Sequence, residues 1–210
     1  MKQIICFGDS NTYGYIPETG KRYPWGIRWT SILSEKLGND DFRVVEEGLC
    51  GRTTVFEDPL RDGRCGVRSF PTILETHAPS EEDVVVIMLG TNDCKTAYGA
   101  SPELIALGAG KLLGQIRAFS EKTKIILVSP IHLGKKVWQS GFDPEFSEKS
   151  VDVSLRLSEE YRKLSERADV FFLDASEYAQ PSEADQEHMN EEGHRNFAEA
   201  VYRKIIEIAA

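Results

Sequence analysis

Two short runs of uninterrupted apolar residues limit what this chain can fold into. They lie within Val84–Leu89 and Lys124–Val128, and neither alternates with polar residues. A strand that is apolar on both faces is typical of a parallel sheet covered by helices on both sides. Three more apolar runs bring the predicted strands to five: Ile4–Phe7, Phe42–Val45, Val84–Leu89, Lys124–Val128 and Val170–Leu173.

Helical patterns lie between and after these strands. Trp29, Leu33 and Leu37 recur every four residues, and a Ser101-Pro102 pair is a typical helix start. Further helices are predicted over residues 147–167 and after Asn190. Alternating strands and helices predict an α/β three-layer α/β/α sandwich with a flavodoxin-like, five-stranded parallel sheet. The length of 210 residues, without internal repeats, leads us to expect a single domain over residues 1–210.

The composition narrows the classes of function and partner. The 25 Lys and Arg against 34 Asp and Glu give a net charge of −9, which argues against nucleic-acid binding. No apolar stretch approaches the roughly 20 residues of a membrane span, and no signal-peptide pattern is found, so we expect a cytoplasmic protein. The four cysteines show no CxxC spacing, and with four histidines we expect neither a metal nor another cofactor.

Two segments are long for plain connections. They are Val55–Glu82 and Ile131–Phe146, and long connections in compact domains commonly form pocket walls or subunit contacts. The second segment carries several aromatic residues, which favours self-association into a homo-oligomer.

Polar segments follow four of the predicted elements, where parallel strands would bring them to one edge of the sheet. Ser10 follows the first strand in a Gly-Asp-Ser turn, which suits either a nucleophile or a phosphate-binding loop. His188, with Asp185 three residues earlier on a predicted helical turn, supplies a base and its orienting carboxylate. The backbone N–H groups of Ser10 and Gly51 and the amide of Asn92 would form an oxyanion hole.

In this order and context, Ser10, Gly51, Asn92 and His188 resemble the four sequence blocks of the SGNH (GDSL-type) hydrolases. The segments 28–30, 46–49, 52–54 and 88–93 look most like the arylesterase/acyltransferase subgroup. The resemblance implies a serine esterase that acts on short-chain carboxylic esters, transfers acyl groups to alcohols or peroxide, and forms oligomers.

The substrate side of the site is less defined by the sequence. Candidate substrate-binding residues are Tyr13, Trp25, Trp138 and Glu187. Glu187 departs from the apolar residue common in the family, and a carboxylate beside the histidine disfavours anionic substrates and raises the histidine pKa. His194 is a rival base, which we interpret as a packing residue in the last helix.

Two other functions remain open at this point. One is a carbohydrate O-acetyl esterase, since polar loops with Arg52, Arg61, Arg64 and Arg68 suit a polar substrate. The other is a non-catalytic, flavodoxin-like phosphate- or ligand-binding domain, which would need the turn around Ser10 but not the residues that converge on it.

Overall fold

Over residues 1–38 and 40–209, the computed structural model contains a parallel sheet of five strands. The strands follow the order β2-β1-β3-β4-β5, which is the flavodoxin-like winding expected from the sequence. The sheet consists of β1 (Lys2–Gly8), β2 (Phe42–Gly48), β3 (Val84–Met88), β4 (Lys124–Ser129) and β5 (Phe171–Asp174). The predicted fold class is confirmed.

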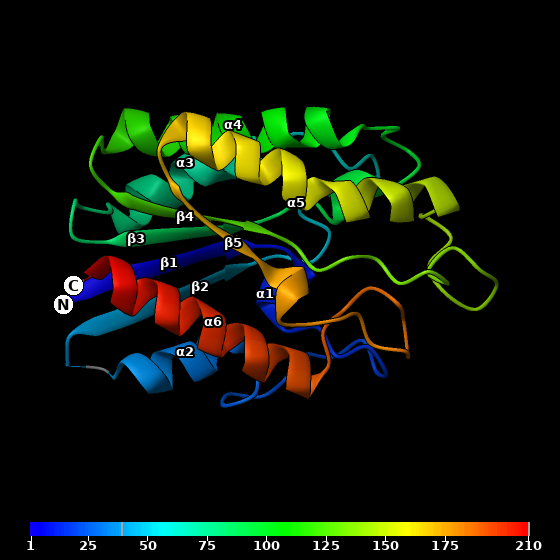
Figure 1. The fold of residues 1–210 in the computed structure, drawn as a ribbon, viewed down its shortest axis with the longest axis horizontal. Helices are drawn as coiled ribbons and strands as arrows, with labels where there is room; N and C mark the ends of the chain where they lie inside the picture. Colours follow the sequence, from blue (N-terminus) through cyan, green and yellow to red (C-terminus); the bar gives the residue numbers. More distant parts are fainter. Residues whose placement is uncertain (39, 210) are drawn as a thin grey trace.

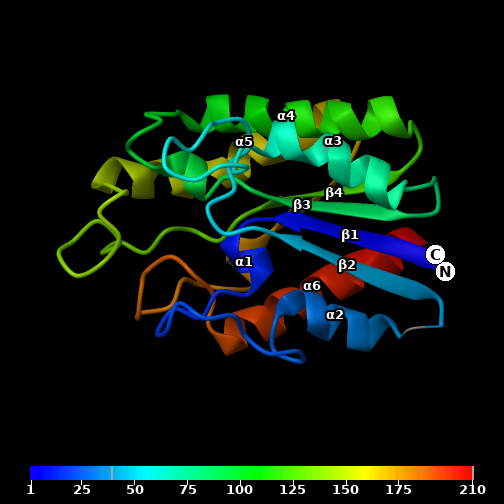
Figure 2. The ribbon, with the colours of Figure 1, turned by 180° about the vertical axis from the view of Figure 1, so that it is seen from behind.

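Helices cover both faces of this sheet, as Figures 1 and 2 show from opposite sides. One face is covered by α2 (Trp29–Leu37) and α6 (Glu191–Ala209). The other is covered by α3 (Gly66–His77), α4 (Pro102–Phe119) and α5 (Glu148–Ala168). No helix in the described part of the chain combines the length and the apolar character needed to cross a bilayer.

The uniformly apolar central strand is explained by a separate core on each face. Along β3, the side chains of Val85 and Ile87 belong to the cluster under α3, α4 and α5, whereas Val84, Val86 and Met88 belong to the cluster under α2 and α6. Successive side chains of a strand point to opposite faces, so a strand buried on both faces must be apolar at every position.

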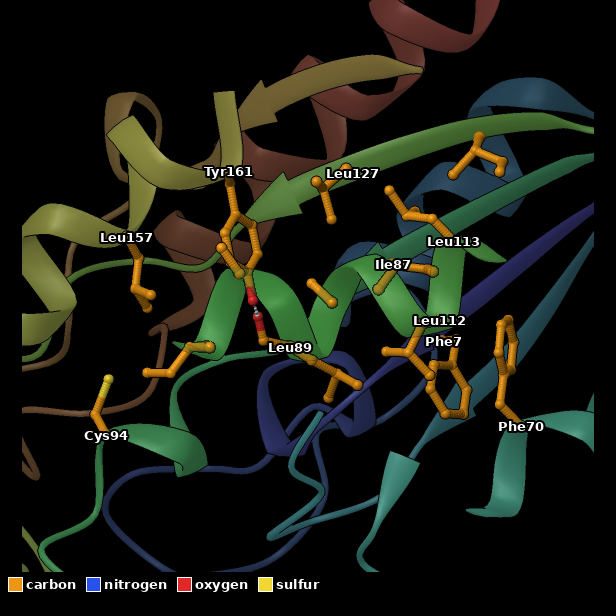
Figure 3. Packing of buried hydrophobic residues seen from close by; sticks show 14 of the residues in the cluster. Phe7, Phe70, Ile87, Leu89, Cys94, Leu112, Leu113, Leu127, Leu157 and Tyr161 are labelled. Carbon is orange, nitrogen blue, oxygen red and sulfur yellow. Dashed lines mark hydrogen bonds between the residues drawn. The ribbon is translucent and has the colours of Figure 1, made fainter. Parts of the chain in front are cut away.

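The core also fixes the point at which β3 ends. Tyr161 on α5 is fully buried, and its hydroxyl donates to the Leu89 carbonyl at 2.9 Å (Figure 3). The chain then turns at Gly90, whose φ of +129° favours glycine. A Cβ at Gly90 would lie 2.9 Å from the Tyr161 hydroxyl oxygen. This packing sets the direction in which the chain leaves the sheet toward Asn92.

The segment Val55–Glu82, expected to be a long connection, contains the helix α3. Pro71 lies inside α3, where the sequence argues against a helix. Proline has no N–H to donate to the carbonyl of Val67, one helical turn earlier. The side-chain amide of Gln115 on α4 donates to that carbonyl instead, at 2.7 Å. The helix is therefore stabilised by a tertiary hydrogen bond that the local sequence does not reveal. The segment Ile131–Phe146 has the irregular conformation that was expected.

Candidate active site

Ser10 is the first residue of α1 (Ser10–Tyr13), a single helical turn at the carboxyl end of β1. The Asp9 carboxylate accepts the backbone N–H of Asn11 at 3.0 Å and caps the turn. Gly14, with φ +84°, ends it and donates its N–H to the Ser10 carbonyl at 2.9 Å. These local bonds hold the Ser10 hydroxyl at the edge of the sheet.

The turn can sit this close to the sheet because β2 ends in a glycine. A Cβ at Gly48 would lie 2.2 Å from the backbone nitrogen of Tyr13, which is far inside van der Waals contact. Only a residue without a side chain is compatible with this close approach of β2 and α1.

His188 and Asp185 lie in an irregular loop just before α6. The Oδ1 atom of Asp185 accepts the backbone N–H groups of Glu187 and His188, both at 3.0 Å. Gln186 between them has φ +63°, so the segment forms an Asx turn and not the helical turn expected from the spacing. Asp185 and His188 do face one another, as the sequence predicted, but through a different backbone conformation.

These residues form a hydrogen-bonded chain of carboxylate, imidazole and hydroxyl. Asp185 Oδ2 lies 2.6 Å from His188 Nδ1, and His188 Nε2 lies 2.8 Å from Ser10 Oγ. With its Nδ1 proton held by the carboxylate, the imidazole presents a lone pair to the serine hydroxyl. The arrangement is chemically able to remove the hydroxyl proton as the oxygen attacks an electrophile.

The charges around the imidazole favour its protonated form. Burial by itself would lower the pKa of His188, but the Glu187 charge and the hydrogen bond and charge of Asp185 outweigh it, and the pKa is raised. Burial would likewise raise the pKa of Asp185, yet its hydrogen bonds and the His188 charge lower it. Both shifts stabilise an imidazolium beside a carboxylate.

A hydrogen bond joins the histidine loop to the serine turn. The backbone N–H of Met189 donates to Asn11 Oδ1 at 2.9 Å, across 178 residues of sequence. The loop is also held from the side by the N–H of Gly134, which donates to the Gln186 carbonyl at 2.7 Å. The histidine loop is thus held next to the serine turn by one side-chain contact and one backbone contact.

Ser10, Gly51 and Asn92 line the same pocket. The candidate donors that they carry are the backbone N–H groups of Ser10 and Gly51 and the side-chain amide of Asn92. No partner for either N–H is found among residues 1–38 and 40–209. Asn92 Nδ2 uses one proton to bond the Arg52 carbonyl at 3.2 Å and has a second to offer. Such a group of donors suits an oxyanion.

Arg52 holds the loop that carries Gly51 and has no free face for a substrate. Its guanidinium is buried, donates to the carbonyls of Gly8 (2.7 Å) and Glu47, and lies 4.2 Å from the centre of the Phe7 ring. Burial lowers the pKa of Arg52 to about 10, so the side chain remains cationic. The expectation that Arg52 suits a polar substrate is corrected to a structural role.

The pocket above Ser10 has a volume of about 140 Å³ and a charged wall. Its charged side chains, apart from His188, are Arg61, Lys95, Asp143, Glu145 and Glu187. Lys95 bonds Glu145 at 2.6 Å, and Arg61 bonds Asp58 at 2.8 Å. Arg64 and Arg68 do not line this pocket.

Three of the four candidate substrate-binding residues lie away from this pocket. The Tyr13 ring packs 4.7 Å from the Arg22 guanidinium, and Trp25 and Trp138 are 56% and 41% exposed. The aromatic wall comes instead from Tyr15, whose ring centre lies 4.4 Å from that of His188. Of the four candidates, Glu187 lines the pocket.

Tyr13 and Tyr15 diverge because of the left-handed residue between them. Gly14 caps the single-turn helix in the left-handed conformation, with φ +84°, so the helical periodicity stops there. The spacing of three residues after Ser10 is therefore a poor guide to which tyrosine reaches the site. A glycine directly after Tyr13 was the sequence signal for this helix end.

The rival base His194 is buried on the other side of the loop. Its Nδ1 accepts the backbone N–H of Trp29 at 3.3 Å, and its ring lies 5.3 Å from that of Tyr23. It makes no contact with Ser10. Across the described ranges, no group of three or more His, Cys, Asp or Glu side chains is arranged to hold a metal ion.

An α/β sandwich in which a serine turn meets a histidine loop at the edge of a parallel sheet is the architecture of a serine hydrolase. The profile of the GDSL-like lipase/acylhydrolase family matches residues 6–195. The chain belongs to this family, and it is a carboxylic ester hydrolase.

Solved structures agree over the whole fold. The aryl esterase of M. smegmatis is 34% identical, with 99% of each chain covered and a TM-score of 0.92. A carbohydrate acetylesterase from Sinorhizobium meliloti is 32% identical, covering 99% of this chain and 100% of its own, with a TM-score of 0.90. None of the curated proteins compared matches the chain.

Proposed function

We propose that the protein hydrolyses short-chain carboxylic esters, or transfers their acyl groups, through an acyl-Ser10 intermediate. The observation that carries the proposal is the chain from Asp185 through His188 to Ser10, with links of 2.6 and 2.8 Å. A serine hydroxyl needs such a base to act as a nucleophile at neutral pH.

In the acylation half, Ser10 Oγ attacks the ester carbonyl while His188 Nε2 takes its proton. The carbonyl oxygen becomes an oxyanion among the N–H groups of Ser10 and Gly51 and the Asn92 amide. The tetrahedral intermediate then expels the alcohol oxygen, which receives the proton from His188. Asp185 keeps the imidazole in the tautomer that both transfers need.

In the second half, water or an alcohol loses its proton to His188 and attacks the acyl-Ser10 carbonyl. Collapse of this second intermediate releases the carboxylic acid or the new ester and returns the proton to Ser10 Oγ. The nucleophile, base and oxyanion donors are the same in both halves, as microscopic reversibility requires.

The size of the pocket supports a short acyl group. Its volume of about 140 Å³ lies well below the roughly 300–1,000 Å³ of pockets that hold drug-sized ligands. An acetyl group fits in such a space more readily than a long chain.

A carbohydrate O-acetyl esterase is a second candidate within the same chemistry. The charged pocket wall favours it, because sugar hydroxyls find hydrogen-bond partners there. The relative from Sinorhizobium meliloti carries that name. A phosphate-binding role is disfavoured, since Asp143, Glu145 and Glu187 place three carboxylates around the space that an anion would occupy.

The test is p-nitrophenyl acetate hydrolysis by the wild type, Ser10→Ala and the matched control Ser176→Ala. Ser176 lies in the short 3₁₀ helix Ala175–Glu177 after β5, where its hydroxyl donates to Asp174 at 2.7 Å. We expect Ser10→Ala to lower kcat by about 10⁴-fold or more and Ser176→Ala to retain activity. Equal rates for the wild type and Ser10→Ala would refute the nucleophile. A panel of acetyl, butyryl and octanoyl esters tests the acyl length.

We also propose that residues 1–210 act as one domain, since both core clusters pack on one sheet.

The four cysteines are free thiols, which supports the proposed cytoplasmic location. The exposed Trp25 and Trp138 support a homo-oligomer. Light scattering on the purified protein tests the oligomer, and a mass equal to 23.6 kDa at micromolar concentration would refute it.

A further inference from the structure

Glu187 is a buried carboxylate that faces the pocket without a donor from the protein. The residue is 7% exposed and lines the space above Ser10. Its Oε1 lies 3.8 Å from His188 Nε2, which is longer than a hydrogen bond. Among the described residues, no N–H or O–H group donates to this carboxylate.

The nearby cations are already engaged. Lys95 bonds Glu145 at 2.6 Å, and Arg61 bonds Asp58 at 2.8 Å. The other titratable groups near Glu187 are the carboxylates of Asp9, Asp143 and Asp185, the imidazole of His188, the Tyr15 hydroxyl and the Cys50 thiol. Burying a carboxylate is costly unless hydrogen bonds compensate it. Glu187 is therefore an acceptor for a donor that arrives with the substrate.

The position of Glu187 indicates which part of the substrate brings the donor. The leaving alcohol oxygen must approach His188 Nε2 to receive its proton. Glu187 Oε1 is 3.8 Å from the same nitrogen, so it lies within reach of a group attached to the leaving alcohol. A hydroxyl on the carbon next to the ester-bearing carbon is close enough to that oxygen to reach Glu187.

We propose that Glu187 selects esters whose alcohol carries a free hydroxyl on the neighbouring carbon, which are partial esters of polyols. The inference rests on the proposed function, because it uses His188 as the group that protonates the leaving oxygen. The same place receives the attacking water or alcohol in the second half of the reaction. Glu187 therefore also favours a diol over a simple alcohol as acyl acceptor.

A matched pair of esters tests this selection. The esters are 2-hydroxyethyl acetate and 2-methoxyethyl acetate, which differ in whether the second oxygen carries a proton. A hydrogen bond to a charged acceptor predicts a kcat/KM for the hydroxy ester about 10- to 100-fold above that for the methoxy ester. Glu187→Leu should bring the ratio close to one, and Glu187→Gln, which keeps an acceptor, should retain part of it.

The control variant is Glu183→Leu, in the same loop but with an exposed side chain outside the pocket. It should keep the wild-type ratio. As a second readout, ethylene glycol should divert more acyl groups from water than 2-methoxyethanol does in the wild type, and equally in Glu187→Leu. Because each ratio is measured within one variant, partial loss of folded protein does not change it.

The outcomes separate this inference from the proposed function. Hydrolysis of both esters with equal kcat/KM, abolished by Ser10→Ala, would overturn the selection and leave the esterase in place. Hydrolysis of neither ester, with Ser10-dependent hydrolysis of p-nitrophenyl acetate retained, would overturn only the selection. Loss of all three activities in the wild type would overturn both. A stronger preference for acetylcholine than for 2-hydroxyethyl acetate would also overturn the selection, because it would show attraction of a positive charge without a hydroxyl.

Discussion

Replacing His194 by glutamine should change the pH dependence of stability without removing activity. His194 is fully buried, and its Nε2 has no partner within the described residues. Burial, followed by the charges of His188 and Arg28, lowers its pKa to about 3. A proton on Nδ1 would also abolish the bond from the Trp29 N–H. The folded protein thus holds His194 in its neutral form.

The magnitude follows from the difference between the folded and unfolded states. An unfolded histidine has a pKa of about 6.5, so below that pH the unfolded chain takes up a proton that folded His194 does not. The contribution of His194 is fully present above pH 6.5 and is lost as the pH falls toward 3. Between pH 7 and pH 5, the loss is about 2 kcal/mol.

Urea unfolding of the wild type and His194→Gln at pH 7, 6 and 5 measures this difference. The wild-type curve alone does not isolate it, because burial raises the pKa of Asp9 to about 7 and that of Asp93 to about 6. These two carboxyl groups bind protons more readily in the folded state, so they increase stability as the pH falls from about 7. Taking the difference in unfolding free energy between the wild type and His194→Gln at each pH removes the contribution of these two carboxyl groups.

The gap in unfolding free energy between the two proteins should therefore shift by about 2 kcal/mol from pH 7 to pH 5. If the unfolding free energies of the two proteins differ by the same amount at every pH, within about 0.5 kcal/mol, the claim that His194 is neutral in the folded protein is refuted. Esterase activity of His194→Gln at pH 7 should stay within about threefold of the wild type, whereas a loss near 10³-fold would identify His194 as the base after all.

Three further changes test the site and its support. Asp185→Asn should lower kcat by about 10³- to 10⁴-fold with little change in melting temperature, because the amide stabilises the wrong tautomer of the His188 imidazole. The rate of p-nitrophenyl acetate hydrolysis measures this loss. Tyr161→Phe leaves the buried Leu89 carbonyl without its donor and should lower the unfolding free energy in urea by about 1–3 kcal/mol. Gly48→Ala should lower the free energy of unfolding by about 3 kcal/mol or more. The control Gly114→Ala in α4, with open space at its Cβ, should leave stability unchanged or raise it. Equal melting temperatures for the two variants would contradict the close approach of β2 to α1.

The fold was predictable from the sequence because its main signal is local. Val84–Met88 is apolar at every position since each face of β3 meets its own helical layer, and this pattern is sufficient to indicate a doubly covered sheet. Parallel strands then place their carboxyl ends at one edge. The proximity of Ser10, Asn92 and His188 was predictable for that reason.

What was not predictable depends on contacts between distant segments. Pro71 concealed α3 because the Gln115 amide that stabilises the helix comes from another element. The positive φ of Gln186 turned the expected helical turn before His188 into an Asx turn. The choice between Tyr13 and Tyr15 depended on the left-handed helix cap at Gly14, which helical periodicity does not describe.

The bond between Ser10 and His188 spans 178 residues, and this has a consequence for the order of events during synthesis. Ser10 closely follows β1, the first strand to be synthesised, whereas His188 follows all five strands of the sheet. A nascent or prematurely terminated chain that stops before residue 185 carries Ser10 without either partner. Under the proposed mechanism, esterase activity requires synthesis through His188, and fragments that end before Asp185 are inactive as esterases.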